Sequence, residues 1–343
     1  MRPLRILTWH VHGSYLYYLA GVPHELYLPV RDGRPEGYGG RSTGFRWPET
    51  VHEVPAQRVR DLDLDVVLFQ SRRNWEVDQH ELLSDEQRRL PRVYLEHDPP
   101  LGHPTDTRHP VDDPDVLLVH VTPFNALMWD SGRTPHTVVE HGVSVPGGTR
   151  PTYELERGIS VVNNLTRRGR RLGPDVFLAA RERVPLDLVG LGSTDAGGLG
   201  DLPLADLPAF EARYRFFFNP IRYTSLGLAV CEAMALGLPV VGLATTEMAT
   251  AVENGVSGWV DTDLGRLVER MHELLADPAE ARRLGDGARA RARERFGIER
   301  FRRDWDRVFR DVAGQTGLTA LGGSSRPATA ARPGQPTASG ARA

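Results

Sequence analysis

The chain has 343 residues, a length that fits about two domains and allows sizeable buried cores. Its 42 basic and 45 acidic residues leave a net charge of −3, which gives no overall attraction to nucleic acid or to a strongly anionic surface. All the basic residues except the histidines are arginines, which excludes lysine chemistry. The single cysteine, Cys231, excludes a disulfide framework.

The first half of the sequence alternates short apolar runs with helical or polar stretches. Buried strands are predicted at residues 5–8, 66–69, 93–95 and 116–119. The first twenty residues partly resemble a signal peptide, but His10, His12 and Gly13 interrupt the apolar stretch. We therefore expect a first strand that runs into a loop, and a cytoplasmic protein.

The second half repeats this alternation, with strands predicted at residues 159–162, 186–189, 215–218 and 239–244. The pattern favours two doubly wound, Rossmann-like α/β domains that face each other across a cleft, at residues 1–150 and 151–297. Residues 298–314 are expected to form a helix whose apolar stripe docks back on the first domain. Residues 315–343, rich in Gly, Ser, Pro, Thr and Ala, are predicted to be a disordered tail.

One stretch of the second half, LGLAVCEAMALGLPVVGLA, holds a single charge, the carboxylate of Glu232. Gly237 and Pro239 exclude a membrane span and predict a helix over 226–236 followed by a strand. A carboxylate in apolar surroundings costs several kcal/mol, about 3 or more, unless a partner or a ligand satisfies it. Glu232 is therefore expected to belong to a site.

The segment around Glu232 resembles the donor-binding segment of retaining glycosyltransferases of family 4 (glycosyl transferases group 1), which have the GT-B fold. The residues that carry this resemblance are Pro220, Gly227, Leu228, Glu232 to Ala235, Gly237, Pro239 to Val241, Val252 to Gly255 and Gly258. The resemblance implies that Glu232 accepts hydrogen bonds from the ribose hydroxyls of a nucleotide sugar. A carboxylate suits a diol, because it can accept two charge-assisted hydrogen bonds.

The sequence departs from the family at the acid eight positions before Glu232, where it has Thr224. In the family that acid contacts the donor sugar, and a following glycine-rich loop approaches sugar and phosphate. Here this loop reads Thr246-Glu247-Met248, without the glycines. We hypothesise that Glu247 replaces the missing acid as a catalytic-side group, so that E247A would reduce turnover more than T224A. The alternative is a surface acid in the first turn of a helix.

The resemblance also implies a set of residues near the donor phosphates and the reacting sugar. Arg168 falls on the position of a phosphate-binding lysine and Asn164 near an expected arginine, so that Arg167, Arg170 or Arg171 is left to supply a second charge. The backbone around Gly227, Leu228 and Thr246 is expected near sugar and phosphate. Gly13 is placed in the first strand-to-helix loop, close to the phosphates. His97 falls on the catalytic-side histidine, whereas His141 is interpreted as structural. The alternative for Arg168 is a place in a solvated basic loop. The alternative for His97 is a histidine whose hydrogen bonds are satisfied within a Pro-rich turn.

The predicted function is retaining transfer of a sugar from a nucleotide diphosphate sugar to an unknown acceptor (a glycan, a lipid or a small molecule), without a metal or other cofactor. Three Asp-rich stretches, at 61–65, 112–115 and 261–263, are better explained as caps and turns than as metal sites. A non-catalytic nucleotide-sugar-binding subunit and a nucleotide-sugar epimerase are the alternatives. No nucleic-acid partner or membrane span is expected, whereas peripheral membrane contact stays open.

Overall fold

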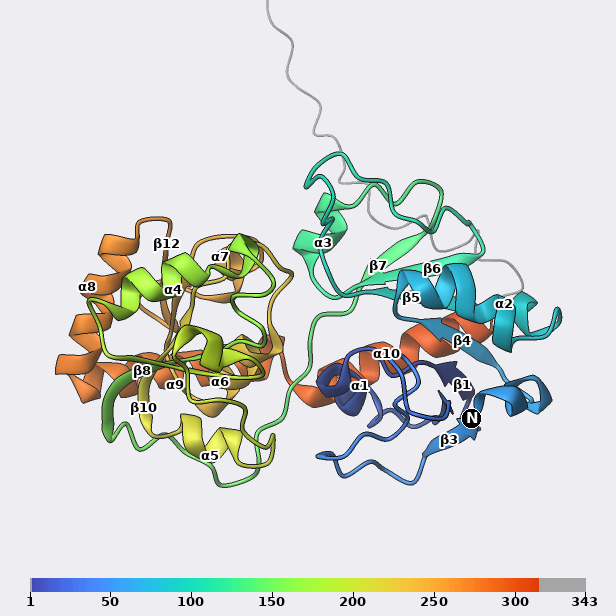
Figure 1. Cartoon of the computed structure of the whole chain (residues 1–343), viewed down its shortest axis with the longest axis horizontal. Helices are drawn as coiled ribbons and strands as arrows, with labels where there is room; N and C mark the ends of the chain where they lie inside the picture. Colours follow the sequence, from blue (N-terminus) through green and yellow to red (C-terminus); the bar gives the residue numbers. More distant parts are fainter. Residues whose placement is uncertain (1, 315–343) are drawn as a thin grey trace, which may run out of the picture.

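The structure, a computed structural model, describes residues 2–314 and consists of two α/β domains that lie side by side (Figure 1). The first domain is built on a seven-stranded sheet and the second on a five-stranded sheet, and every pair of neighbouring strands in both sheets is parallel. The predicted tail lies outside the described residues. No helix in residues 2–314 is both long and apolar enough to cross a membrane.

The first sheet has the order β3-β2-β1-β4-β5-β6-β7, so the chain starts in the middle and winds outward in both directions. Its central strands are apolar on both faces, as expected for strands covered by helices on both sides. The strands are β1 (Arg5–Thr8), β2 (Glu25–Val30), β3 (Val51–Pro55), β4 (Val66–Phe69), β5 (Arg92–Glu96), β6 (Val116–His120) and β7 (His136–Val138). The helices of this domain are α1 (Gly13–Leu19), α2 (Gln79–Leu82) and α3 (Pro123–Met128).

The second sheet has the order β12-β11-β10-β8-β9. Its strands are β8 (Leu155–Val161), β9 (Leu186–Val189), β10 (Tyr214–Asn219), β11 (Val240–Leu243) and β12 (Gly258–Asp261). Its helices are α4 (Pro174–Arg181), α5 (Leu207–Glu211), α6 (Leu228–Leu236), α7 (Met248–Ala251), α8 (Leu264–Ala276) and α9 (Pro278–Arg295). Helix α6, which carries Glu232, is thus held between the sheet and α9, with which it makes a close contact.

The last described helix, α10 (Ile298–Gly314), crosses from the second domain to the first (Figure 1). Its apolar stripe packs in the core on one face of the first sheet, and Phe301 and Trp305 are fully buried there. The side chain of Phe301 lies against Gly142, where a β-carbon would come within 2.1 Å of Cβ of Phe301 and 2.4 Å of its ring atom Cγ. The glycine after His141 therefore allows α10 to pack against the segment that leads into the second domain.

All eight strands predicted from the apolar runs are present, with ends shifted by at most a few residues. Four strands were not predicted: β2, β3, β7 and β12. Three of these, β3, β7 and β12, are edge strands, whose mixed polar composition gives little signal in the sequence. The fold class is confirmed, because both domains have the doubly wound parallel architecture that the alternation predicts.

His120, the last residue of β6, makes folding sensitive to acid. It is fully buried, and neither ring nitrogen has a hydrogen-bond partner in the part of the chain that the structure describes. Burial lowers the pKa of His120 to about 3. In the unfolded chain His120 has an ordinary pKa near 6.5. Below that pH the unfolded chain therefore takes up a proton at His120 that the folded chain does not.

We accordingly predict that His120 stabilises the fold less as the pH falls below about 6.5, by about 1.4 kcal/mol per pH unit. The variant H120L should lose about 2 kcal/mol less unfolding free energy than the wild type between pH 7 and pH 5. Urea unfolding at the two pH values measures this difference. The exposed His80 offers a control, since H80L should keep the wild-type pH dependence. Parallel losses in H120L and the wild type would contradict the prediction.

Candidate functional site

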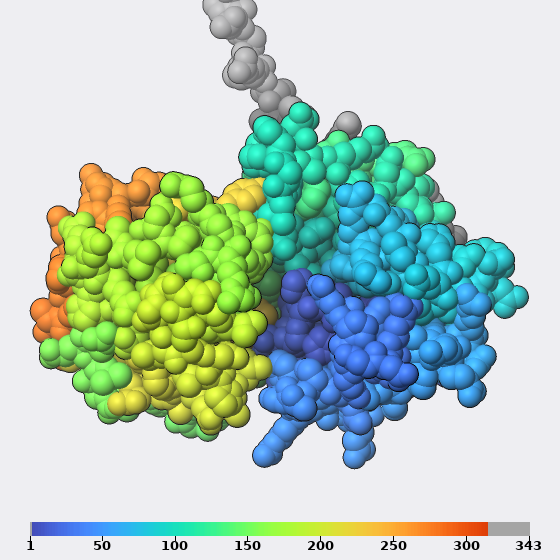
Figure 2. All heavy atoms as spheres, viewed as in Figure 1, coloured from blue at the N-terminus to red at the C-terminus, as the bar shows by residue number. Residues whose placement is uncertain are grey.

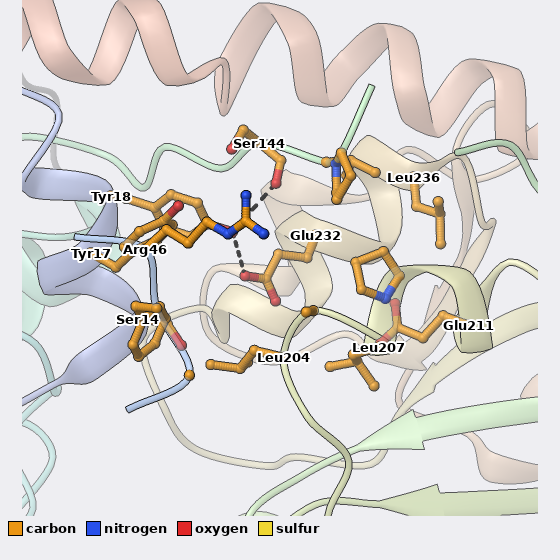
Figure 3. A pocket seen from close by; sticks show the side chains of 16 residues that line it. Ser14, Tyr17, Tyr18, Arg46, Ser144, Leu204, Leu207, Glu211, Glu232 and Leu236 are labelled. Atoms are coloured by element: carbon orange, nitrogen blue, oxygen red, sulfur yellow. Dashed lines mark hydrogen bonds between the residues drawn. The ribbon is translucent and has the colours of Figure 1, made fainter. Parts of the chain in front are cut away.

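A furrow separates the two domains (Figure 2), and part of it is a pocket of about 530 Å³ that we call the Glu232 pocket. Both domains contribute its walls (Figure 3). From the first domain come residues of α1 and of the 44–46 loop, and from the second come Glu232 and Leu236 of α6 with residues of and before α5. The linking segment at 144–146 lies between the two sides.

Glu232 lies at the junction of the two domains, since it faces Tyr18 of α1. The Tyr18 hydroxyl donates a hydrogen bond of 2.8 Å to Oε1 of Glu232. Burial raises the pKa of Glu232, and the hydrogen bond from Tyr18 opposes this rise. Arg46 lines the same pocket (Figure 3), but no arginine among residues 2–314 forms an ion pair with this carboxylate, so its remaining acceptor capacity faces the pocket. This arrangement suits a ligand that donates hydroxyl hydrogens.

The start of α6, one turn before Glu232, faces open space. No side chain caps its N-terminus, and a β-carbon on Gly227 would have no atom within 4 Å. The unpaired backbone N–H groups of a helix start favour an anion. Leu228 packs on the cores of both domains and so places this helix start at their boundary. Thr224, on the preceding loop, is partly exposed.

Four arginines follow β8, and the structure divides them into two pairs. Arg167 pairs with Asp195 at 2.9 Å, and Arg170 with Asp175 at 3.3 Å. Arg168 and Arg171 have no acidic partner in the described chain. Burial and the nearby charge of Arg168 lower the pKa of Arg171. Of the three arginines that the sequence left open, Arg171 is thus the one without an acidic partner in the described chain.

The position of Arg171 follows from backbone contacts with the loop before Thr224. The N–H groups of Arg222 and Tyr223 donate to the Arg171 carbonyl at 2.8 and 3.0 Å. Gly173, with a φ of +73°, lets this loop approach Pro220, because a β-carbon there would lie 2.0 Å from the Pro220 carbonyl oxygen. The arginine loop and the loop that precedes α6 are therefore one packed unit.

Two of the predicted site residues have left-handed backbone conformations. Asn164 has a φ of +54° and Thr246 a φ of +51°. Asparagine adopts this conformation readily, whereas a β-branched threonine does so at a cost of about 1–2 kcal/mol. Thr246 thus keeps a backbone shape typical of glycine at the place where the family has glycines. Its hydroxyl lies 3.4 Å from the Ser225 carbonyl, which connects it to the loop before α6.

His97, at the carboxyl end of β5, is grouped with other aromatic rings on the first domain. Its ring centroid lies 4.1 Å from that of His12 and 4.8 Å from that of Tyr15. Burial lowers the pKa of His97 well below its usual range. Gly13 follows His12 directly, and a β-carbon there would lie 3.1 Å from the His10 ring. His97 and Gly13 thus both lie beside His12 in the first domain.

The protonation of His97 follows from the orientation of Gln70. The Gln70 amide nitrogen donates to Thr8 Oγ1 at 2.8 Å and to the Trp9 carbonyl at 2.9 Å. Its Oε1 therefore faces His97 Nε2, 3.2 Å away, and accepts the proton that Nε2 carries. A neutral imidazole with the proton on Nε2 keeps a free lone pair on Nδ1. His97 can thus accept a hydrogen bond from a hydroxyl group.

Charges of the two domains meet near His12. Burial lowers the pKa of His12, and Arg168 of the second domain lowers it further, while Asp98 of the first domain opposes them. Asp98 likewise acts on Arg171. The arginine loop of the second domain therefore faces the histidine cluster of the first domain across the cleft. An anion placed there would meet cationic or neutral donors on the second-domain side.

Glu247 has other partners than the predicted sugar. It is 2% exposed, its Oε2 accepts the N–H of Phe124 at 2.9 Å, and its Oε1 pairs with Arg295 and with the Thr250 hydroxyl. Arg295 also pairs with Glu140. This geometry argues against Glu247 as the replacement for Thr224, because both carboxylate oxygens already have protein partners. Glu247 instead connects the second domain to α3 of the first.

Sequence reasoning missed three residues of this site: Tyr18, Glu211 and His12. Tyr18 and Glu211 both line the Glu232 pocket. Tyr18 belongs to the other domain, and Glu211 lies more than 20 residues before Glu232 in the sequence. Their side chains carried no motif that could have identified them. Within residues 2–314, no group of three or more His, Cys, Asp or Glu side chains is arranged to hold a metal ion.

Comparison with known proteins agrees with the predicted resemblance. Residues 191–277 match the family described as Glycosyl transferases group 1. No curated protein sequence matches the chain. Among solved structures, sucrose-phosphate synthase (tll1590) from Thermosynechococcus elongatus is similar with a TM-score of 0.68 at 15% identity, covering 92% of this chain and 100% of that one.

Two further solved structures are similar over nearly the whole chain. A glycosyltransferase from Rickettsia africae has a TM-score of 0.66 at 10% identity and covers 92% of this chain and 100% of that one. Anabaena Alr3699/HepE in complex with UDP-glucose has a TM-score of 0.61 at 15% identity and covers 90% and 100%. These likenesses establish the GT-B fold: two Rossmann-like domains that face each other across a cleft.

The ionic contacts of Glu247 give a prediction about stability. The variant E247Q should lower the unfolding free energy by about 2 kcal/mol, because it leaves the largely buried Arg295 with one carboxylate instead of two. Chemical denaturation measures the change. Glu253 is the control, since it is more exposed and lies 3.4 Å from Arg291. E253Q should change stability by less than about 0.5 kcal/mol. Equal effects of the two variants would contradict a structural role for Glu247.

Proposed function

We propose that this chain, which has the GT-B fold and a segment of the glycosyl transferases group 1 family, transfers a sugar from a nucleoside diphosphate sugar to an acceptor with retention of configuration. The observation that carries the proposal is the order of charges along the cleft. Arg168 and Arg171 lack acidic partners in the described chain and face the histidine cluster, and Glu232 lies further along in a pocket between the domains.

This order matches the chemistry of a nucleotide sugar. The diphosphate is anionic and suits the two arginines and the uncapped start of α6. The ribose hydroxyls are hydrogen-bond donors and suit the carboxylate of Glu232. The similar Anabaena Alr3699/HepE has been solved in complex with UDP and with UDP-glucose, which supports a donor of this class.

In the proposed reaction, negative charge develops on the departing diphosphate. Groups that are already oriented toward that charge stabilise the transition state more than groups that must reorganise. Arg168, Arg171 and the α6 N–H groups have this role, without a metal ion. The free Nδ1 lone pair of His97 accepts a hydrogen bond from a sugar hydroxyl and orients the donor. The acceptor approaches from the first domain.

A second candidate, a nucleotide-sugar-binding subunit without turnover, has a specific observation in its favour. The acid expected at position 224 is a threonine, and Glu247 is held by Arg295. Thermal-shift screening with UDP-, GDP-, ADP- and dTDP-sugars identifies the donor, because a ligand at about 100 times its Kd stabilises by about 2.7 kcal/mol. Release of the nucleoside diphosphate with an acceptor panel then separates the candidates. Binding without release would favour the subunit.

The phosphate contacts can be tested on the arginines themselves. R168M and R171M should each weaken the binding of the selected nucleoside diphosphate about tenfold, corresponding to about 1.4 kcal/mol for one charge-assisted contact. Isothermal titration calorimetry measures the Kd. Arg170 is a matched control from the same loop, because Asp175 already pairs with it. A loss of affinity in R170M as large as in R171M would contradict the assignment.

The ribose contact predicts a different pattern. E232Q should weaken the nucleoside diphosphate about tenfold while leaving the affinity for inorganic pyrophosphate unchanged, because only the nucleoside reaches the Glu232 pocket. The same calorimetric titrations compare the two ligands. An equal loss for both ligands would show that E232Q disturbs the whole cleft rather than one contact.

A further inference from the structure

A second pocket, of about 640 Å³, lies where the chain passes twice between the domains, and the proposed function does not use it. One wall is the linking segment at 143–150. The other wall is formed by the C-terminal part of α9 and the start of α10, which returns to the first domain (Figure 1). Residues 144–146 also line the Glu232 pocket, so the two pockets share one wall. We call this second site the linker pocket.

Arginines dominate the charge of the linker pocket. Five of them line it, and only Arg300 pairs with an acid, Asp304, among residues 2–314. Two acids also line it: Glu299, which pairs with Arg302 at 3.0 Å, and Glu294, which has no basic partner in the described chain. Four positive charges without an acidic partner in that part of the chain thus face one negative charge, and they belong to Arg150, Arg289, Arg293 and Arg303.

The arginines lie close enough to repel one another. Burial lowers the pKa of Arg289, and the charges of Arg150 and Arg293 lower it further, whereas Asp286 opposes them. The Arg289 guanidinium also donates a hydrogen bond to the Leu236 carbonyl, which holds it in place. Like charges that are held together cost free energy, and a bound anion removes this cost.

The linking segment leaves room for a ligand beside these arginines. The N–H of Thr149 donates to the Pro146 carbonyl at 3.2 Å and closes a turn over Gly147 and Gly148. Gly148 has a φ of +94°, and a β-carbon on either glycine would have no atom within 4 Å. The turn therefore presents backbone rather than side chains to this space. Backbone N–H groups in such turns are suited to anions.

We propose that the linker pocket binds an anion that carries phosphate groups, at a site separate from the proposed donor site. Guanidinium groups suit phosphate oxygens, because several N–H groups of one arginine can bond to them at once. A bound anion joins Arg150 of the linking segment to the arginines of α9 and α10. It thereby connects the two places where the chain crosses between the domains.

The position along α6 separates this site from the donor diphosphate. The diphosphate is proposed to lie at the start of α6, next to Leu228, whereas the linker pocket is lined by Ala235, near the end of the helix. At a rise of about 1.5 Å per residue, these two residues lie about 10 Å apart along the helix. The inference therefore does not rest on the proposed function.

Calorimetric titration of the full chain with inorganic pyrophosphate tests the site. The titrations use the double variant R168M/R171M as the background, so that binding at the proposed donor site is weakened first. In this background, R150M and R293M should each weaken the binding of pyrophosphate about tenfold, because each removes one charge-assisted contact.

Arg283 provides the matched control. It lies on α9 like Arg293, but it pairs with Glu280 at 2.6 Å. R283M in the same background should therefore leave the affinity for pyrophosphate unchanged. The Tm without ligand checks the fold: R293M should keep or raise the Tm of the background, because it removes a repelling charge. A lower Tm would contradict the repulsion on which the inference depends.

A second arm of the experiment identifies the source of the phosphate. Co-sedimentation with vesicles of phosphatidic acid and phosphatidylcholine detects binding to a lipid headgroup. Vesicle binding that R150M and R293M abolish would assign the site to a lipid headgroup, whereas pyrophosphate binding alone would assign it to a soluble anion. The inference is overturned if R150M and R293M affect neither ligand, or if R283M weakens binding as much as R293M does.

These outcomes are independent of the proposed function. If nucleoside diphosphates fail to bind to the wild type, the proposed function is overturned, but a pyrophosphate site that depends on Arg150 and Arg293 still stands. Conversely, the loss of the linker site leaves the effects of R168M and R171M on nucleoside diphosphate binding as they are.

Discussion

The hydrogen bond from Tyr18 to Glu232 crosses the boundary between the two domains, and the rest of the site is arranged around it. A carboxylate at such a boundary loses most of its hydration, and one neutral hydroxyl does not replace it. An arginine would satisfy the acid fully but would also leave no acceptor for a ligand. Arg46 lines the same pocket but forms no ion pair with Glu232, so the carboxyl group keeps acceptor capacity for a ligand. The domain interface is therefore less stable than it could be at the place where a ligand is proposed to bind.

The position of this boundary depends on packing far from the cleft. Trp305 of α10 donates a hydrogen bond of 3.0 Å to the Tyr15 hydroxyl, and the Tyr15 ring contacts His97 and His141 edge-on. Helix α1, which carries Tyr15 and Tyr18, is thus fixed by the helix that returns from the second domain. The ion pairs of Arg295 with Glu247 and Glu140 hold the other side of the interface. Aromatic packing and buried charge together set the width of the cleft.

The sequence predicts the interior of this fold better than its borders. Strands buried on both faces are continuous apolar runs, and the central strands β1 and β4 agree with the predicted residues at both ends. The edge strand β12 begins at Gly258, whose φ is +149° and where a β-carbon would lie 1.9 Å from the Val240 carbonyl oxygen. Its place in the sheet thus depends on a close backbone approach to another strand. Apolar periodicity carries no information about such an approach.

The residues of the site likewise divide into those that local sequence identifies and those that only tertiary contacts identify. The motif around Glu232 and the histidine after β5 could be identified in the sequence because they follow strands and helix starts that the sequence also predicts. Arg171 could not be distinguished from its neighbours, because only the folded structure shows that Asp195 and Asp175 already pair with Arg167 and Arg170. Glu247 was misjudged for the same reason, since Arg295 lies 48 residues away. A charged residue becomes available for function only when no tertiary partner neutralises it, and partners of this kind are determined by the fold rather than by local sequence.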